Sequence, residues 1–421
     1  MVVGVAGGIA AYKAAELVRL LDKAGATVDV AMTPRAQHFI TPITFQALTR
    51  RPVFTDLFSL TDEEKIGHIQ LADAADIVVI APASADICAR MAAGMSDDVV
   101  TSIALATRAP VLLAPSMNVN MWNHVLTQRN LATLRDVAKY QIVAPGDGFL
   151  ACGWTGPGRL AEPAEIVEAM AHVLSAQDLA GVKLVVTAGP TYEAIDPVRF
   201  VGNRSSGKMG AAIAAAAQRR GADVRLIVGP SGVAPPVGVR TSHVESAAQL
   251  GWALENAVKD ADVVVMTAAV ADFRPAKVAD QKIKRGATKN MTIELVANPD
   301  LLAGLGKARR GVRPLLVGFA AETHDVVANA QAKLVSKGCD LVVANDVAEP
   351  GAGFAVDTNH VQLVYANGVT DVPSASKAEV AHRILDRVVE MRASAARSPA
   401  PGTSSTARGP RQRSSRVTPR R

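Results

Sequence analysis

Cysteine, aromatic residues and long apolar runs are all scarce in this chain of 421 residues. Its three cysteines, Cys88, Cys152 and Cys339, are too few and too far apart for the disulfide framework of a secreted domain. No apolar stretch approaches the roughly 20 residues of a membrane span, and no charged region precedes the first apolar segment as in a signal peptide. These absences predict a cytoplasmic protein with no membrane partner.

Acidic residues are missing from residues 392–421, where eight of the arginines lie. Because the whole chain has a net charge of only +6, the part before these residues is slightly acidic. A basic surface for nucleic acid is therefore not expected on the folded body. The Ser-, Pro- and Arg-rich composition of 392–421 predicts a disordered tail.

Short apolar runs alternate with longer Ala-rich segments of helical period, which is typical of parallel strands connected by helices. The pattern stops near residue 178 and starts again, so the sequence predicts an α/β fold with two doubly wound, Rossmann-like domains, residues 1–177 and 178–391. The expected strands are Val2–Val5, Val28–Met32, Ile77–Ile80 and Val111–Leu113, then Lys183–Thr187, Val224–Val228, Val263–Thr267, Leu315–Phe319 and Leu341–Ala344. Residues 274–296 look like a flexible flap, and Ser376–Met391 like the last helix.

The stretch GNRSSGKM, residues 202–209, nearly matches a nucleotide phosphate loop but has Met209 where a magnesium-binding Ser or Thr belongs. The nearest preceding strand also ends too early for such a loop. Because a helix follows, Ser205, Ser206 and Gly207 are expected at its start, where backbone amides bind anions. An ordinary N-cap serine is the alternative that the residues alone leave open.

Longer motifs identify a family resemblance. The segments GPTYEAIDPVRFVGNRSSGKMG, TAAVADFRPA, QKIK, NPD and GFAAET resemble the phosphopantothenate–cysteine ligase family. The segments GGIAAYK, GHIQLADAAD, APASADICARMAAGMSDD, PSMNVNMW and ACGWTGPGRLAEP resemble flavin-dependent phosphopantothenoylcysteine decarboxylases. Both halves in this order are similar to the bifunctional coenzyme A biosynthesis proteins of bacteria, over roughly residues 2–390.

For the first half, the resemblance implies that the substrate thiol is oxidised to a thioaldehyde by flavin mononucleotide (FMN), that carbon dioxide leaves, and that hydride and proton return. His68 matches the active-site histidine, Asn118 the asparagine that holds the substrate carboxylate, and Cys152 the proton donor. Taken alone, His68 would more often be an ordinary surface or core residue, and Cys152 an inert buried thiol. The residues expected to bind FMN are Gly8, Ile9, Thr33, Phe39, Ala83, Ser84, Ala85, Asp86 and Met117.

For the second half, the resemblance implies an acyl-cytidylate, made from cytidine triphosphate (CTP), that the cysteine amine attacks. Asn203 and Lys282 match the catalytic residues, although Lys282 in a charged loop would ordinarily be a solvated residue. The substrate phosphate is assigned to Arg199, Ser205, Ser206 and Gly207. The residues expected to bind CTP are Gly189, Met266, Thr267, Ala268, Asp272, Lys282, Pro299, Asp300, Leu301, Leu302, Phe319, Lys333 and Lys337.

Magnesium or manganese is expected with CTP, held mostly by phosphate and water oxygens, with Asp272 as a possible ligand. The substrates are then 4′-phosphopantothenate, L-cysteine and CTP. The resemblance also implies a homo-oligomer, a dodecamer built from decarboxylase trimers and ligase dimers. The alternatives are a chain with one active half, and a flavin-binding module without turnover.

Overall fold

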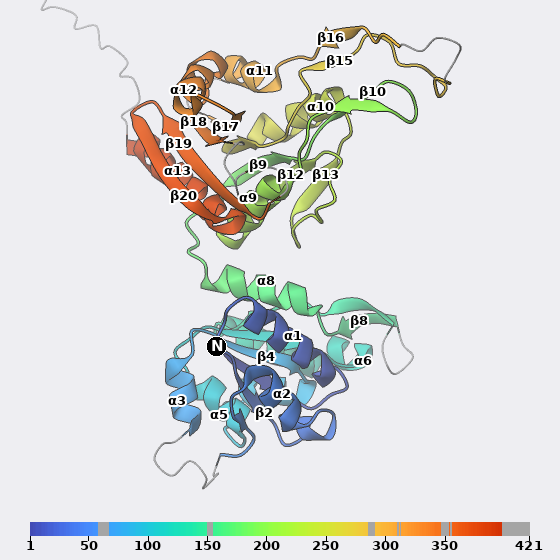
Figure 1. The fold of residues 1–421 in the computed structure, drawn as a ribbon. Helices are drawn as coiled ribbons and strands as arrows, with labels where there is room; N and C mark the ends of the chain where they lie inside the picture. Colours follow the sequence, from blue (N-terminus) through green and yellow to red (C-terminus); the bar gives the residue numbers. More distant parts are fainter. Residues whose placement is uncertain are drawn as a thin grey trace, which may run out of the picture.

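The computed structural model describes residues 1–57, 67–149, 155–284, 291–309, 311, 313–346, 353 and 356–397. Two α/β domains follow one another along the chain (Figure 1). The expected pair of doubly wound domains is therefore confirmed.

The N-terminal domain is built on a parallel sheet of six strands in the order β3-β2-β1-β4-β5-β6. The central strands are buried along their whole length, which explains their nearly unbroken apolar sequence. Gly4 in β1 allows close packing, because a Cβ there would lie 2.8 Å from Val100 Cγ1 on α5. The strands are β1 (Val2–Val5), β2 (Asp29–Met32), β3 (Val53–Phe54), β4 (Val78–Ala83), β5 (Val111–Pro115) and β6 (Gln141–Ile142).

Helices cover both faces of this sheet, so that two apolar cores form, one on each side. One face carries α1 (Ala11–Lys23), α2 (Pro42–Thr49) and α8 (Pro163–Leu174). The other carries α3 (Gly67–Ala74), α4 (Ala85–Ala92), α5 (Val99–Ala106) and α7 (Val125–Asp136). The short η1 (Ala36–His38), α6 (Val119–Asn123) and the hairpin of β7 (Gly146–Phe149) and β8 (Thr155–Arg159) complete the domain.

The C-terminal domain has an eight-stranded sheet in the order β13-β12-β9-β14-β17-β18-β19-β20. The first six strands are parallel and the last two antiparallel, and this terminal pair was not expected from the sequence. The strands are β9 (Lys183–Ala188), β12 (Asp223–Val228), β13 (Arg240–His243), β14 (Val263–Met266), β17 (Leu315–Glu322), β18 (Leu341–Asp346), β19 (Thr358–Tyr365) and β20 (Gly368–Ser376).

Helices again cover both faces: α9 (Lys208–Arg219) and α13 (Lys377–Arg397) one, α10 (Ala247–Ala257), α11 (Leu301–Ala308) and α12 (Val326–Lys337) the other. The short η2 (Val258–Asp260) follows α10. Two antiparallel ribbons, β10 (Tyr192–Ala194) with β11 (Phe200–Gly202) and β15 (Phe273–Pro275) with β16 (Leu295–Ala297), extend to one side of the sheet (Figure 1).

Helix α13 runs past the expected end at Met391 to Arg397, so the first residues assigned to the tail are helical. The segment RASAAR has high helix propensity, and the first proline comes only at residue 399. Residues 398–421 lie outside the described part.

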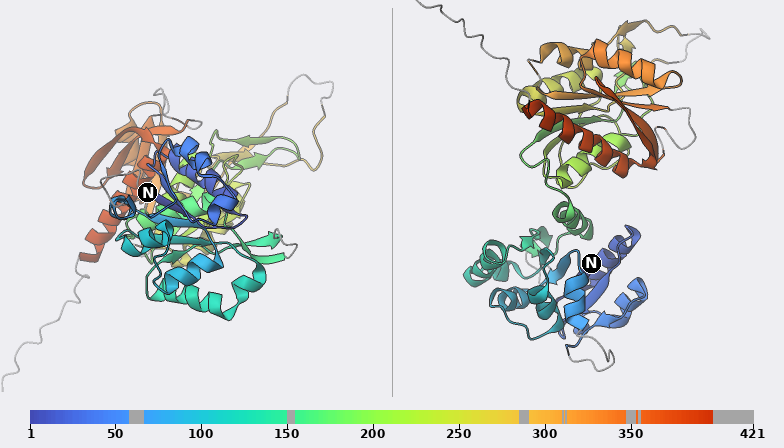
Figure 2. Two further views of the ribbon diagram at one scale, coloured as in Figure 1. Left: turned by 90° about the horizontal axis from the view of Figure 1, so that it is seen from below. Right: turned by 90° about the vertical axis from the view of Figure 1, so that its left-hand side faces the viewer.

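The two domains meet at α8 and α9, on either side of the connection that follows α8 (Figure 2, right). Arg219 at the end of α9 binds Glu168 of α8 through two hydrogen bonds of 2.6 and 2.8 Å. Arg220 ties the connection to the second domain, because it pairs with Asp178 and with Asp386 of α13. Among the helices described, none is long and apolar enough to cross a membrane.

Candidate functional site

In each domain a cavity opens where the strand order reverses, between β1 and β4 in the first and between β9 and β14 in the second. Ligands of doubly wound sheets bind at this switch point, outside the carboxyl ends of the strands. The two cavities measure about 580 and 780 Å³. The molecule therefore offers two separate candidate sites.

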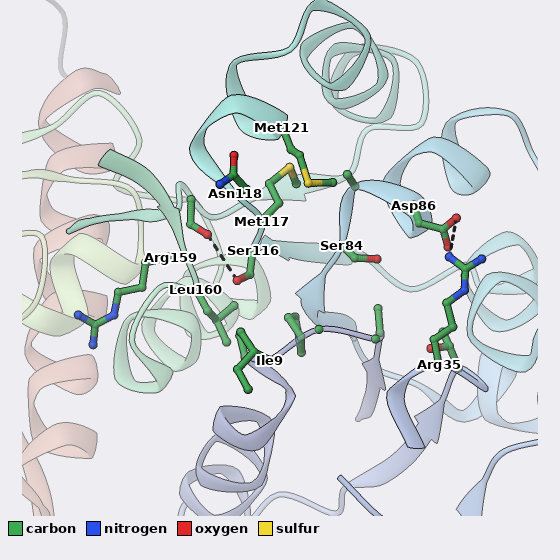
Figure 3. A pocket seen from close by; sticks show the side chains of 18 of the residues that line it. Ile9, Arg35, Ser84, Asp86, Ser116, Met117, Asn118, Met121, Arg159 and Leu160 are labelled. Atoms are coloured by element: carbon green, nitrogen blue, oxygen red, sulfur yellow. Dashed lines mark hydrogen bonds and ion pairs between the residues drawn. The ribbon is translucent and has the colours of Figure 1, made fainter. Parts of the chain in front are cut away.

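The first cavity begins at the turn from β1 into α1. Gly7 must be glycine, because a Cβ there would lie 2.6 Å from Arg35 Cβ, whereas Gly8 faces open space. Figure 3 shows Ile9 and Leu160 on one side of the cavity and Met117 and Met121 on the other. A planar apolar ring fits between such side chains, and the amides that begin α1 suit a phosphate.

Charged residues close one end of this cavity. Arg35 lies 3.2 Å from Asp86 on α4 (Figure 3). Asp86 also pairs with Arg90 of the same helix. Ser84 caps α4 by accepting a hydrogen bond from the amide of Ile87. The α4 N-terminus is thus fixed against the end of β2.

Asn118 follows β5 and caps α6, accepting a 2.8 Å hydrogen bond from the amide of Asn120 through Oδ1. This bond orients the amide group, so that Nδ2 is the atom that can donate to a ligand carboxylate. Gly158 of β8 packs against the residues that follow β5. Its carbonyl accepts a hydrogen bond from the Met117 amide, and a Cβ at Gly158 would lie 2.3 Å from the Met117 carbonyl oxygen. The β7–β8 hairpin is thereby held beside Asn118.

Most residues that the sequence assigns to FMN line this cavity together with Asn118. They are Gly8, Ile9, Thr33, Ser84, Ala85, Asp86 and Met117. Ala83 is fully buried at the end of β4, and Phe39 is 51% exposed; neither lines the cavity. His68, on α3, is not among its described lining residues either, and Cys152 lies outside the described part of the chain. Ser116, Met121 and Arg159 are lining residues that the sequence did not single out.

The two described cysteines are poor candidates for proton transfer. Burial raises the pKa of Cys88 to about 12 and that of Cys339 to about 11. Their thiols stay protonated near neutral pH and lie within the apolar cores.

The second cavity lies against the start of α9. Gly207 is the N-cap, with a φ of 77°, and no side chain of the N-cap residue caps the helix. The N-cap position therefore falls on Gly207 and not on a serine, although Ser206 Oγ accepts a 3.4 Å hydrogen bond from the amide of Lys208, the first residue of α9. Ser205, Ser206 and Gly207 line the cavity, as does Asn203, whose Nδ2 donates a 2.9 Å hydrogen bond to the Val270 carbonyl.

The residues assigned to CTP also gather there, from the ends of β14 and β17 and from α11 and α12. The lining includes Met266, Thr267, Ala268, Asp272, Pro299, Asp300, Leu301, Leu302, Phe319, Lys333 and Lys337. Lys333 donates to the Phe319 carbonyl at 2.6 Å, and burial lowers its pKa. Lys337 pairs with Asp300, so that both lysines lie on the cavity side of α12, as their spacing predicts.

Three expected ligase residues lie outside the cavity lining. Gly189, at the end of β9, has a φ of 77° and packs against Gly229. The Arg199 guanidinium binds Asp196, which lowers the pKa of that carboxyl, and donates to the Ile283 carbonyl at 2.7 Å. Lys282 precedes Ile283 and is exposed, so Arg199 anchors the flap.

Sequence reasoning missed several lining residues of this cavity: Lys208, Asn298, Asn345, Asn359 and Lys377. Asn359 lies on β19 and Lys377 at the start of α13. Both reach the cavity only because β19 and β20 add an antiparallel pair to the sheet, and the sequence pattern did not predict this pair. Within the described residues, no group of three or more His, Cys, Asp or Glu residues could hold a metal ion. Asp272 and Asp300 are the carboxylates among the described lining residues, and Asp300 is paired with Lys337.

Gly210→Ala should impair the second site selectively. A Cβ at Gly210 would lie 2.5 Å from both Ala188 Cβ and Thr267 Oγ1, so the first turn of α9 must move away from the sheet. We expect the activity of the second site, whose motifs resemble those of ligases, to fall by about 10²-fold, as for an ångström-scale displacement of reacting groups. Steady-state kinetics measured separately for the two sites check this. Gly304→Ala on α11, where a Cβ meets nothing within 4 Å, is the matched control; equal losses in both variants would contradict the steric account.

Comparisons with known proteins agree with the division of the chain into two domains. Residues 1–175 match the family model described as Flavoprotein, and residues 179–391 that described as DNA/pantothenate metabolism flavoprotein C-terminal domain. Coenzyme A biosynthesis bifunctional protein CoaBC of Vibrio cholerae is 45% identical over 391 residues, covering 93% of this chain and 98% of that protein. The protein of the same name from Mycobacterium bovis is 48% identical over 404 residues, 92% and 96% of the two chains.

A crystal structure of the C-terminal domain of CoaBC is 40% identical and covers 52% of this chain and all of that one, with a TM-score of 0.45. The matches to the full-length relatives cover more than nine tenths of this chain and therefore span both domains. The chain therefore belongs to the family of coenzyme A biosynthesis bifunctional proteins CoaBC.

Proposed function

We propose that this chain joins 4′-phosphopantothenate to L-cysteine with CTP, and then decarboxylates 4′-phosphopantothenoylcysteine to 4′-phosphopantetheine with FMN. The observation that carries the proposal is the pair of cavities, each of which is lined by most of the residues assigned to the nucleotide or cofactor of one of the two reactions. The full-length similarity to bifunctional relatives supports the same division of labour. We place the reactions in the cytoplasm.

The first cavity fits FMN by its shape and its residues. Ile9, Met117 and Leu160 would enclose the isoalloxazine ring, and the amides at Gly8 and Ile9 would receive the phosphate. Bound there, FMN would supply the two-electron oxidation that decarboxylation requires and the subsequent reduction.

The chain's own residues would bind the substrate and move protons. Asn118 Nδ2 would donate to the substrate carboxylate, since Oδ1 is already held by Asn120. Cys152 would protonate the decarboxylated product. His68 would exchange a proton, but α3 carries it outside the cavity lining of its own chain. We therefore propose that His68 serves the cavity of a neighbouring copy, in a trimer of the first domain.

In the second cavity, a carboxylate oxygen of phosphopantothenate would attack the α-phosphorus of CTP, and pyrophosphate would leave. The cysteine amine would then attack the acyl carbon; the acyl C–O bond breaks, CMP departs with the electron pair, and the amine proton passes to solvent. Asn203, fixed by Val270, would donate to the activated acyl group. Lys333 and Lys337 would contact the nucleotide, and Lys282 would reach it by movement of the flap. Mg²⁺ would enter with the triphosphate, with Asp272 beside it.

Cys152→Ser should stop formation of 4′-phosphopantetheine while pyrophosphate release continues at the wild-type rate. Serine keeps the shape of the side chain but is a much weaker acid than a thiol. The assay is product analysis by mass spectrometry alongside pyrophosphate detection. Cys88→Ser, at a buried thiol outside both cavity linings, is the control. Loss of pyrophosphate release in Cys152→Ser would contradict two separate sites.

A further inference from the structure

One part of the ligase cavity wall has no role in the mechanism so far. It is formed by the first turn of α9, the start of β19 and the start of α13, which contribute Lys208, Asn359 and Lys377. Lys208 Nζ lies 2.6 Å from Asp357 Oδ1, so that the ion pair joins α9 to the residues before β19.

Asn359 is the unusual residue of this wall. It is only 4% exposed and lines the cavity, and its Oδ1 accepts no hydrogen bond from any residue that the structure describes. A buried acceptor without a donor is destabilising unless water or a ligand supplies one. A ligand that carries an N–H, O–H or S–H group could donate the hydrogen bond that Asn359 Oδ1 lacks.

The same wall is positively charged. Lys377 is 7% exposed and donates to the carbonyls of Gly353, Val356 and Thr358, and burial lowers its pKa. With Lys208, it brings two ammonium groups to this wall, and the ion-pair partner of Lys208, the Asp357 carboxylate, is 88% exposed. The start of α9 adds the positive end of a helix dipole. An anionic group is thus favoured beside Asn359.

The polyphosphate of CTP matches only half of this description, because near neutral pH it has acceptors but almost no donors. An α-amino acid matches both halves, with an amine that donates and a carboxylate that accepts. 4′-Phosphopantothenate also carries both kinds of group, but its phosphate is already assigned to Ser205, Ser206 and Gly207. L-Cysteine is the amino acid in the proposed function, on which this inference rests. Its amine must reach the activated acyl group beside Asn203, and Asn203 lines the same cavity as Lys208 and Asn359.

We propose that Lys208 and Asn359 form the subsite for L-cysteine in the ligase reaction. Lys208 exchanges Asp357 for the α-carboxylate of the amino acid, and Asn359 Oδ1 accepts a hydrogen bond from its amine. Lys377 is a positioning residue, because its three carbonyl contacts hold Gly353, Val356 and Thr358 against the start of α13.

The test separates cysteine binding from nucleotide chemistry. Pyrophosphate release is measured in a single turnover with phosphopantothenate and CTP but no cysteine, and the cysteine KM is measured in the complete reaction. Lys208→Gln and Asn359→Ala should each raise the cysteine KM by about 10-fold or more, the effect of losing a hydrogen bond to a charged group. Pyrophosphate release should stay within about two-fold of wild type, since these contacts form only with cysteine.

Three further measurements sharpen the result. Lys208→Arg should restore most of the cysteine affinity, because it keeps the charge. Cysteamine, which lacks the carboxylate, should show the same KM in wild type and Lys208→Gln. Lys183→Gln is the matched control, because it removes an ion-paired lysine at the start of β9, the end of the strand away from the cavity. It should change neither the cysteine KM nor pyrophosphate release.

Two results would overturn the subsite. Loss of pyrophosphate release in Lys208→Gln, with an unchanged cysteine KM, would show that the wall binds the polyphosphate. Unchanged constants in both variants would show that the wall contacts neither cysteine nor the polyphosphate. If the wild-type chain releases no pyrophosphate with any triphosphate, the proposed function itself fails, which is a different outcome from a failure of the variants alone.

Discussion

Replacing Asn203 with alanine is expected to lower the ligase rate by about 10²- to 10³-fold, the usual loss when one fixed donor to a developing charge is removed. The Asn203 amide is held by its 2.9 Å hydrogen bond to the Val270 carbonyl, so it faces the cavity in one orientation. The same variant should decarboxylate added 4′-phosphopantothenoylcysteine at the wild-type rate, because the first cavity is built entirely from the other domain.

The measurement is pyrophosphate release from the complete ligase mixture and carbon dioxide release from the added intermediate. Asn256→Ala, an asparagine at the end of α10 outside the cavity lining, is the control. A ligase rate within a few-fold of wild type in Asn203→Ala would remove this residue from the catalytic centre.

The second large effect is a recovery of activity. His68→Ala and Asn118→Ala should each lower decarboxylation by about 10²-fold or more when tested alone, as is usual for loss of an acid–base or binding group. If His68 of one copy completes the cavity that contains Asn118 of another, co-expression of the two variants should restore about one quarter of the sites on random assembly. In each mixed trimer, about one site in three should be restored, because a head-to-tail ring of three then contains one intact interface.

The recovery is measured on purified mixed oligomers that carry two different affinity tags, with carbon dioxide release as the readout. Oligomers made from His68→Ala alone and from Asn118→Ala alone are the controls. Mixed oligomers no more active than these would place His68 and Asn118 in the site of a single chain, or His68 outside the site.

The nine expected strands correspond to central strands of the two sheets. They were predictable because parallel strands buried on both faces need continuous apolar runs, as in Val263–Met266. The expected cavity residues largely meet for a related reason: the turns after these strands all lie at the carboxyl edge of one sheet. Thus Met117 and Ser84 share one cavity, and Asn203 and Met266 the other, although each pair is far apart in the chain.

The misses have physical causes too. Asn359 and Lys377 reach the ligase cavity through β19 and the start of α13, and the mixed polar sequence of β19 and β20 gave no clear strand signal. The assignment of Arg199 to a phosphate stays a prediction; the structure adds its ion pair with Asp196, which the motif alone did not indicate. His68 matches its motif, but a motif does not tell which copy of the chain it serves.

Incubation of the purified chain with phosphopantothenate, cysteine, Mg²⁺ and one triphosphate at a time tests the central claim most directly. Our account predicts release of both pyrophosphate and carbon dioxide with CTP, and continued pyrophosphate release without 4′-phosphopantetheine when Cys152 is replaced by serine. Absence of both pyrophosphate and carbon dioxide with every triphosphate would contradict it.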